Sequence, residues 1–119
     1  MSDNDNTRLF MTTMQEIRRL GRHIGEKFQP DKIILFGSYA RGSEHADSDV
    51  DLLVIMPSQE RGLRGLHQAA KIRADLKTHF PVDVIVRSPE EVRARLEIGD
   101  FFMREILEQG KVLYEAGNG

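Results

Sequence analysis

The chain has 119 residues, no cysteine and a formal net charge of −2. This length suits one domain with its own buried core, and the lack of cysteine excludes disulfides and thiolate zinc sites. A domain that binds the nucleic-acid backbone usually carries a strong basic excess, so nucleic acid is a poor candidate for the main partner.

The start of the chain and its apolar runs favour neither secretion nor a membrane. The start, MSDNDNTRLF, has no basic segment followed by an apolar run, so we expect no secretory signal. The longest apolar run, Leu52 to Met56, is far too short to span a bilayer. We therefore expect a cytoplasmic protein with one domain over residues 1–119, frayed at 1–6 and 116–119.

Hydrophobic periodicity predicts a helix and two strands in the first half of the chain. The helix ends at Pro30. Lys32 to Phe36 is a short, isoleucine-rich run that predicts a buried strand, and Gly37 to Gly42 follows as a tight connection. Val50 to Met56 predicts a second strand, which Pro57 ends. The apolar face of the helix consists of Leu9, Phe10, Met14, Ile17, Leu20, Ile24 and Phe28.

The middle of the chain predicts a second long helix and then a third strand. Branched residues fill Val82 to Val86, which favours a strand. The apolar face of the second long helix consists of Leu63, Leu66, Ala69 or Ala70, Ile72, Leu76 and Phe80.

The last part of the chain predicts helical structure and an edge strand. Ser88 to Glu91 has a serine at the cap, a proline at the first helical position and acids in the first turn. The helical pattern continues through Ile98, Phe102 and Ile106 until Gly110 ends it, and Val112 to Tyr114 adds an edge strand. We predict an α/β (α+β) fold in which helices cover a small mixed sheet of three or four strands.

Two aspartates stand at the mouth of the second strand. Residues two apart on a strand point to the same face, so Asp49 and Asp51 aim their carboxylates one way. Adjacent carboxylates repel, and the apolar residues that follow them make an unbalanced charge costly. A divalent cation would resolve both problems, and oxygen ligands favour magnesium or manganese over zinc.

A third aspartate interrupts the third strand. Asp83 is the lone charge within Val82 to Val86. If the third strand lies beside the second, Asp83 joins the other two carboxylates. Three carboxylates can hold two metal ions, and two ions can clamp an in-line phosphoryl displacement.

The segment between the first two strands offers groups for a phosphate. Gly37 allows close backbone approach or a positive φ. Ser38 offers a hydroxyl and a backbone N–H, and amides at a helix start attract phosphate oxygens; its alternative role is a simple helix cap. Arg41 either contacts phosphate or faces a partner.

Three other motifs fail in this region. Gly37 to Gly42 has the glycine spacing of a P-loop, but Ser43 and Glu44 replace the required Lys and Ser/Thr. No Gly-x-Gly-x-x-Gly fingerprint occurs. An EF-hand loop starting at Asp47 fails because Leu52 and Ser58 replace its glycine and its bidentate glutamate.

These residues resemble a known family. The order Gly37-Ser38, ten intervening residues and then Asp49-x-Asp51 resembles the signature of the DNA polymerase beta nucleotidyltransferase superfamily. The fuller pattern, Gly-Ser-Tyr-Ala-Arg-Gly followed by Ser-Asp-Val-Asp-Leu, resembles its minimal nucleotidyltransferase (MNT) subgroup. The resemblance runs from about Ile33 to Val86, and more weakly through the final helix and the segment after Gly110.

The resemblance implies roles for these residues. Asp49 and Asp51 would bind two Mg2+ ions, and Asp83 would complete the metal site and accept the proton of the attacking hydroxyl. Gly37 and Ser38 would hold the triphosphate of ATP, the substrate.

The resemblance also implies a partner. Stand-alone MNT proteins are often encoded beside HEPN proteins, which resemble ribonuclease toxins, and act as their antitoxins. The implied reaction transfers AMP from ATP to a tyrosine of the toxin. A second hypothesis keeps this chemistry with a small molecule or an RNA end as acceptor. A third makes the chain a non-catalytic antitoxin that masks its toxin.

Several residues have simpler interpretations. Asp49 and Asp51 could cap a turn, and Asp47 is expected to be a solvated loop residue. Phe101 and Phe102 are adjacent, so one is expected to pack inside while the other meets a partner. No metal-ligand spacing occurs among His23, His45, His67 and His79, and His45 is expected to be a surface histidine. A solvated face of the second helix is expected to explain the basic residues Arg61, Arg64 and Lys71.

Overall fold

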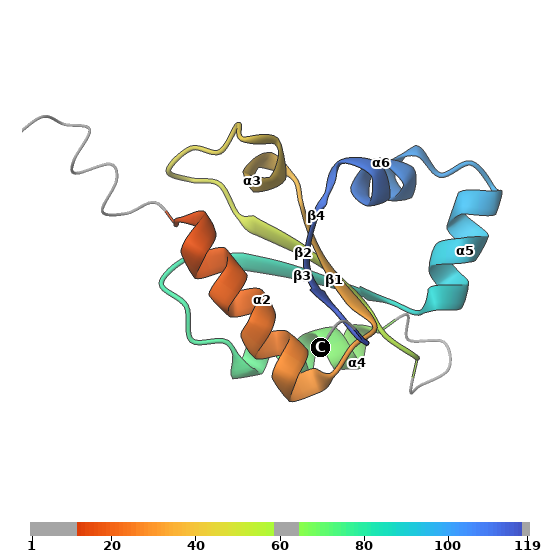
Figure 1. Ribbon diagram of the computed structural model, residues 1–119, viewed down its shortest axis with the longest axis horizontal. Helices are drawn as coiled ribbons and strands as arrows, with labels where there is room; N and C mark the ends of the chain where they lie inside the picture. Colours follow the sequence, from red (N-terminus) through yellow and green to blue (C-terminus); the bar gives the residue numbers. More distant parts are fainter. Residues whose placement is uncertain (1–11, 59–64, 118–119) are drawn as a thin grey trace, which may run out of the picture.

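The computed structural model describes residues 12–58 and 65–117 (Figure 1). It confirms the α/β class, with helices on both sides of a four-stranded mixed sheet. Leu9, Phe10, Arg61, Leu63 and Arg64 lie outside the described residues. The elements are α2 (Met14–Phe28), β1 (Lys32–Phe36), α3 (Ser38–Arg41), β2 (Val50–Ile55), α4 (Leu66–Asp75), β3 (Val82–Arg87), α5 (Pro89–Glu97), α6 (Phe101–Gln109) and β4 (Lys111–Glu115).

The sheet has the strand order β3-β2-β1-β4. β1 pairs antiparallel with both β2 and β4, and β2 pairs parallel with β3. The parallel pair requires a crossover, which runs through α4. β2 and β3 therefore begin on the side of the sheet where β1 ends; this side, which runs across the strand ends, is called an edge below. β4 forms the predicted edge strand.

Each face of the sheet has its own apolar core. Because successive strand residues point to opposite faces, Ile33 and Leu35 of β1 pack with α2 and α4, whereas Ile34 packs with α5 and α6. Asp51 has the same parity as Leu53 and Ile55, which belong to the second core. The carboxylate of Asp51 is therefore on the α5–α6 face.

The second long helix is shorter than its apolar pattern predicts. α4 ends at Asp75, and Leu76 is already extended with φ −78° and ψ 133°. Phe80 still packs against the core, but from the loop that leads into β3. Pro81 disfavours a helical conformation for Phe80, and its carbonyl accepts a hydrogen bond from Val50 N at 3.0 Å. An apolar residue in a loop thus mimicked the helical period.

The last part of the chain forms two helices, α5 and α6. The prediction of one helical stretch that continues through Ile98 is therefore wrong. Gly99 has φ +81°, which ends the first helix. Asp100 then caps α6, accepting a hydrogen bond from Met103 N at 3.1 Å. The predicted serine cap of α5 is confirmed, with a full capping box between Ser88 and Glu91. The break allows α6 to run in a different direction from α5 while it still contacts β1 (Figure 1).

No helix within residues 12–58 and 65–117 is both long enough and apolar enough to cross a membrane.

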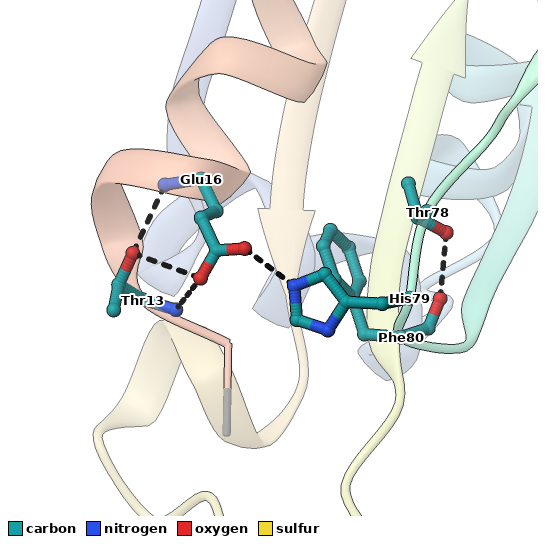
Figure 2. A network of polar contacts seen from close by, with 5 residues as sticks. All are labelled: Thr13, Glu16, Thr78, His79 and Phe80. Carbon is teal, nitrogen blue, oxygen red and sulfur yellow. Dashed lines mark hydrogen bonds and ion pairs between the residues drawn. The ribbon is translucent and has the colours of Figure 1, made fainter. Parts of the chain in front are cut away.

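A polar network ties the start of α2 to the loop before β3 (Figure 2). Thr13 and Glu16 form a capping box, in which Glu16 N donates to Thr13 Oγ1 at 3.2 Å and Thr13 N donates to Glu16 Oε1 at 3.1 Å. The other carboxylate oxygen of Glu16 lies 2.6 Å from Nε2 of His79. His79 also packs edge-on against Phe80. These contacts fix the loop that follows α4 against the start of α2.

Acid should weaken this network. The hydrogen bond from His79, followed by that from Thr13 N, lowers the pKa of Glu16 below its usual 4.5. The stabilisation is therefore present above about pH 4.5 and is lost as pH falls through the lowered pKa of the folded state. Glu16→Gln keeps a capping box but removes the charge. At about pH 7 we therefore expect this variant to melt at a lower temperature than the wild type, with a loss of less than about 1 kcal/mol in the free energy of unfolding. Thermal melts over a pH series should converge in acid; a constant difference would contradict this assignment.

Candidate functional site

The register of the sheet brings the predicted aspartates to one edge. Asp51 pairs directly with Asp83 across the parallel β2–β3 ladder, and paired residues of neighbouring strands point to the same face. Asp49 immediately precedes β2 at this edge. Strand β3 lies beside β2, which was the condition for Asp83 to join the other two carboxylates. We call this place, defined by Asp49, Asp51 and Asp83, the carboxylate edge.

Asp51 is the electrostatic centre of the carboxylate edge. Its side chain is half-buried, whereas Asp49 and Asp83 are exposed. Burial raises the pKa of Asp51, and the charges of Asp83 and then Asp49 raise it further, while Arg41 opposes them. The three carboxylates therefore act on one another, and one guanidinium only partly balances them.

The donor chemistry of the carboxylate edge fits a hard divalent cation. All three groups are carboxylates, which magnesium prefers, and their mutual repulsion gives a cation a favourable place. Within residues 12–58 and 65–117, no three carboxylate or imidazole side chains are gathered closely enough to hold a metal ion. The backbone thus brings the three residues to one edge, and the side chains do not converge on one point.

The backbone of Gly37 lies close to the Asp51 carboxylate. It has φ 78° and ψ −156°, in a region that is essentially restricted to glycine. A Cβ at this position would lie 2.2 Å from Oδ2 of Asp51. Gly37 also occupies the N-cap of α3, and no side chain caps that helix, so the alternative in which Ser38 is the cap is wrong. The predicted tight connection contains this short helix, and Arg41 is its last residue.

A small hydrogen-bonded loop positions Asp49. Ser48 is buried, its Oγ accepts from His45 N at 2.9 Å, and its own N donates to His45 O at 2.9 Å. His45 Nδ1 accepts from Asp47 N at 3.3 Å. Asp47 and His45 are exposed, as predicted. The role of Ser48 was missed, although a serine directly before an aspartate is a common turn signal.

A cavity of about 180 Å3 opens beside Asp51, between α3 and α6. We call it the α6 cavity. The rings of Phe36 and Phe102 meet there edge-to-face, with centroids 5.6 Å apart and an angle of 84°. The sequence pointed to Phe102 as part of a helical apolar face or as a partner contact, and it missed Glu105 and Gln109. The cavity is lined by Phe36, Gly37, Ala40, Arg41, Asp51, Phe102, Glu105, Ile106, Gln109 and Gly110.

The two adjacent phenylalanines of α6 have different environments. Phe102 contacts Phe36 but is still 53% exposed, and Phe101 is 84% exposed, so the expectation that one of them packs inside is wrong. Ile98, at the junction of α5 and α6, is 77% exposed. Exposed apolar side chains therefore gather around the start of α6, the helix that supplies Phe102 to the cavity wall.

The remaining candidates lie away from this site. His23 contacts Asp75 at 2.9 Å and His79 contacts Glu16, so both link α2 to the end of α4 and the loop after it. Lys71 is exposed on α4, as expected for a solvated face.

Comparison with known proteins agrees with this architecture. Residues 17–113 match the family model described as a nucleotidyltransferase domain. A Methanocaldococcus jannaschii protein, provisionally named a protein adenylyltransferase, is 37% identical over 83 residues, which cover 70% of this chain and 77% of that protein.

Two solved structures share the fold. One is a protein of Sulfolobus solfataricus that is provisionally named a nucleotidyltransferase; it has 17% identity and a TM-score of 0.57, with 87% of this chain and 80% of that chain covered. The other is described as a toxin-antitoxin with AMP-PNP; it has 24% identity and a TM-score of 0.51, with 89% and 76% covered. Both similarities bear on the fold alone.

Proposed function

Because this chain belongs to the nucleotidyltransferase domain family, we propose that it transfers AMP from ATP to a tyrosine of a partner HEPN toxin and thereby acts as an antitoxin. One observation carries the proposal: Asp51 and Asp83 are paired in register beside the Gly37 turn. A relative named as a protein adenylyltransferase supports AMP and a protein acceptor. A toxin-antitoxin of the same fold, described with AMP-PNP, supports the class of partner and the nucleotide.

The carboxylate edge would serve as the reaction centre. We propose that Asp49, Asp51 and Asp83 hold two magnesium ions, which when bound supply charge neutralisation on the phosphates and on the departing pyrophosphate. Gly37 and Ser38 lie along the triphosphate, and Arg41 adds a positive charge. The short distance between Gly37 and the Asp51 carboxylate leaves no room for a side chain between this backbone and that carboxylate.

Asp83 is placed to receive a proton. A tyrosine hydroxyl has a pKa near 10, so it attacks poorly unless a base takes its proton. Asp83 is exposed at the outer strand, where an acceptor can reach it. In the proposed step the tyrosine oxygen bonds to the α-phosphorus, the bond from the α-phosphorus to the bridging oxygen breaks, pyrophosphate leaves, and the tyrosine proton goes to Asp83.

The exposed apolar side chains of α6 fit a protein partner. An acceptor tyrosine on another protein must come close to Asp51, and the exposed Phe101 directly precedes Phe102, which lines the adjoining cavity. Large exposed apolar residues grouped near a site are typical of interaction surfaces. We propose that the toxin covers Phe101.

The proposal can be tested by intact mass spectrometry. The protein is mixed with ATP, magnesium and the protein encoded beside it, and a gain of one or more AMP units on that neighbour is expected. Phe101→Asp should block the transfer while ATP binding persists, because a buried charge at an interface is costly. A neighbour that is inhibited but not modified would overturn the proposal in favour of masking. Transfer of AMP only to an RNA end or a small molecule would show that the acceptor is not a protein tyrosine.

A further inference from the structure

We propose that the α6 cavity binds the adenine base of the nucleotide, and that Glu105 and Gln109 select adenine by its exocyclic amino group. This inference rests on the proposed function and adds the origin of its nucleotide preference. It also gives a role to a helix face that the transfer step itself does not use.

The position of the cavity favours the nucleotide over the acceptor. Its wall includes Gly37 and Arg41, the groups proposed for the phosphates, and also Asp51. Asp83, the proposed proton acceptor, is not part of the wall; it belongs to β3, on the other side of β2 from β1. An in-line displacement places the attacking hydroxyl opposite the leaving group. The tyrosine therefore approaches from the side of Asp83, and the cavity remains for the nucleoside.

The size of the cavity fits one ring system. At about 180 Å3, it is smaller than the roughly 300–1,000 Å3 of pockets that bury a drug-sized ligand. A planar base can enter it while the triphosphate extends along α3 toward the carboxylate edge. A whole nucleotide would not fit inside.

The walls offer a base both apolar surface and hydrogen-bonding groups. Phe36 and Phe102 supply aromatic surface, and Ile106 closes the floor as a buried residue. Glu105 and Gln109 are four residues apart on α6, so they project from the same helix face. Within residues 12–58 and 65–117, no hydrogen bond or ion pair engages either side chain. Both are therefore available to a ligand.

The polar pair matches adenine better than guanine or uracil. A glutamine amide can bond both the amino group and N7 of adenine, and a carboxylate accepts from an exocyclic amino group. Guanine presents an oxygen at the position of the adenine amino group, and Glu105 would repel it. Uracil presents no amino group at all.

The test measures binding, so it needs neither acceptor nor turnover. With magnesium present, the wild type is expected to bind ATP about tenfold more tightly than purine riboside triphosphate, which lacks the amino group. In the double variant Glu105→Ala with Gln109→Ala, this preference should disappear. Glu108→Ala is the matched control, because Glu108 is exposed on the same helix and does not line the cavity.

A second pair of variants tests the aromatic wall. Phe102→Ala should weaken the binding of all nucleoside triphosphates by about tenfold, since it removes the surface on which a base lies. Phe101→Ala should leave their binding unchanged. Unaltered preference for ATP in the double variant would overturn the inference, as would a Phe102→Ala variant that affects only the acceptor KM. If ATP binds with the expected preference but no AMP reaches the partner, the proposed function fails and this inference stands.

Discussion

Replacing Asp49 and Asp51 together with asparagine should abolish AMP transfer and leave the fold intact. Asparagine keeps the shape of each side chain but removes the charge that would hold magnesium. Losing metal-assisted charge stabilisation costs several kcal/mol of barrier, so the rate should fall by about a thousandfold or more. Intact mass of the acceptor measures the transfer, and circular dichroism checks the fold.

The stability of this variant should change in the opposite direction to its activity. Burial and the neighbouring carboxylates raise the pKa of Asp51, so its charged form is disfavoured in the folded state. Removing that charge without metal present should therefore raise Tm. Asp47→Asn is the matched control: Asp47 is exposed in the loop that contains Asp49 and is not a proposed metal ligand, so both activity and Tm should stay as in the wild type. Transfer retained by the double variant would refute the assignment of the metal ligands.

Gly37→Ala should damage both stability and activity. Its backbone conformation is essentially confined to glycine, so we expect a loss of about 2 kcal/mol or more. The new Cβ would also lie 2.2 Å from Oδ2 of Asp51, which forces that carboxylate to move. A displacement of about 1 Å in a reacting group can cost about a hundredfold in rate. Chemical denaturation and transfer assays measure the two effects.

Gly42→Ala separates the backbone effect from the contact with Asp51. Gly42 also has a positive φ, +76°, yet a Cβ there would meet nothing within 4 Å. It should lose about 1 kcal/mol of stability and keep its activity. Equal activity losses in the two variants, once both are assayed well below their melting temperatures, would show that the contact with Asp51 is irrelevant.

Local signals in the sequence predicted most individual elements. Strand β1 was predicted with the bounds it has in the structure, and the cap at Ser88 was predicted from its neighbours alone. Both depend on residues within a few positions of one another. Two errors came from the same source: Phe80 and Ile98 continued a helical period that the backbone does not follow, because Pro81 and Gly99 redirect the chain. Apolar spacing reports which side chains are buried, and not whether a helix carries them.

The sequence by itself determined that Asp51 lies in a buried strand and that Asp49 lies directly before it, because the apolar run that defines the strand is a local property. Only the tertiary structure decided that Asp83 lies beside Asp51, since the order of strands depends on a crossover through α4. The same holds for the α6 cavity. Its walls come from the end of β1, from α3 and from α6, and the packing of a helix across a distant strand is not encoded in any local period.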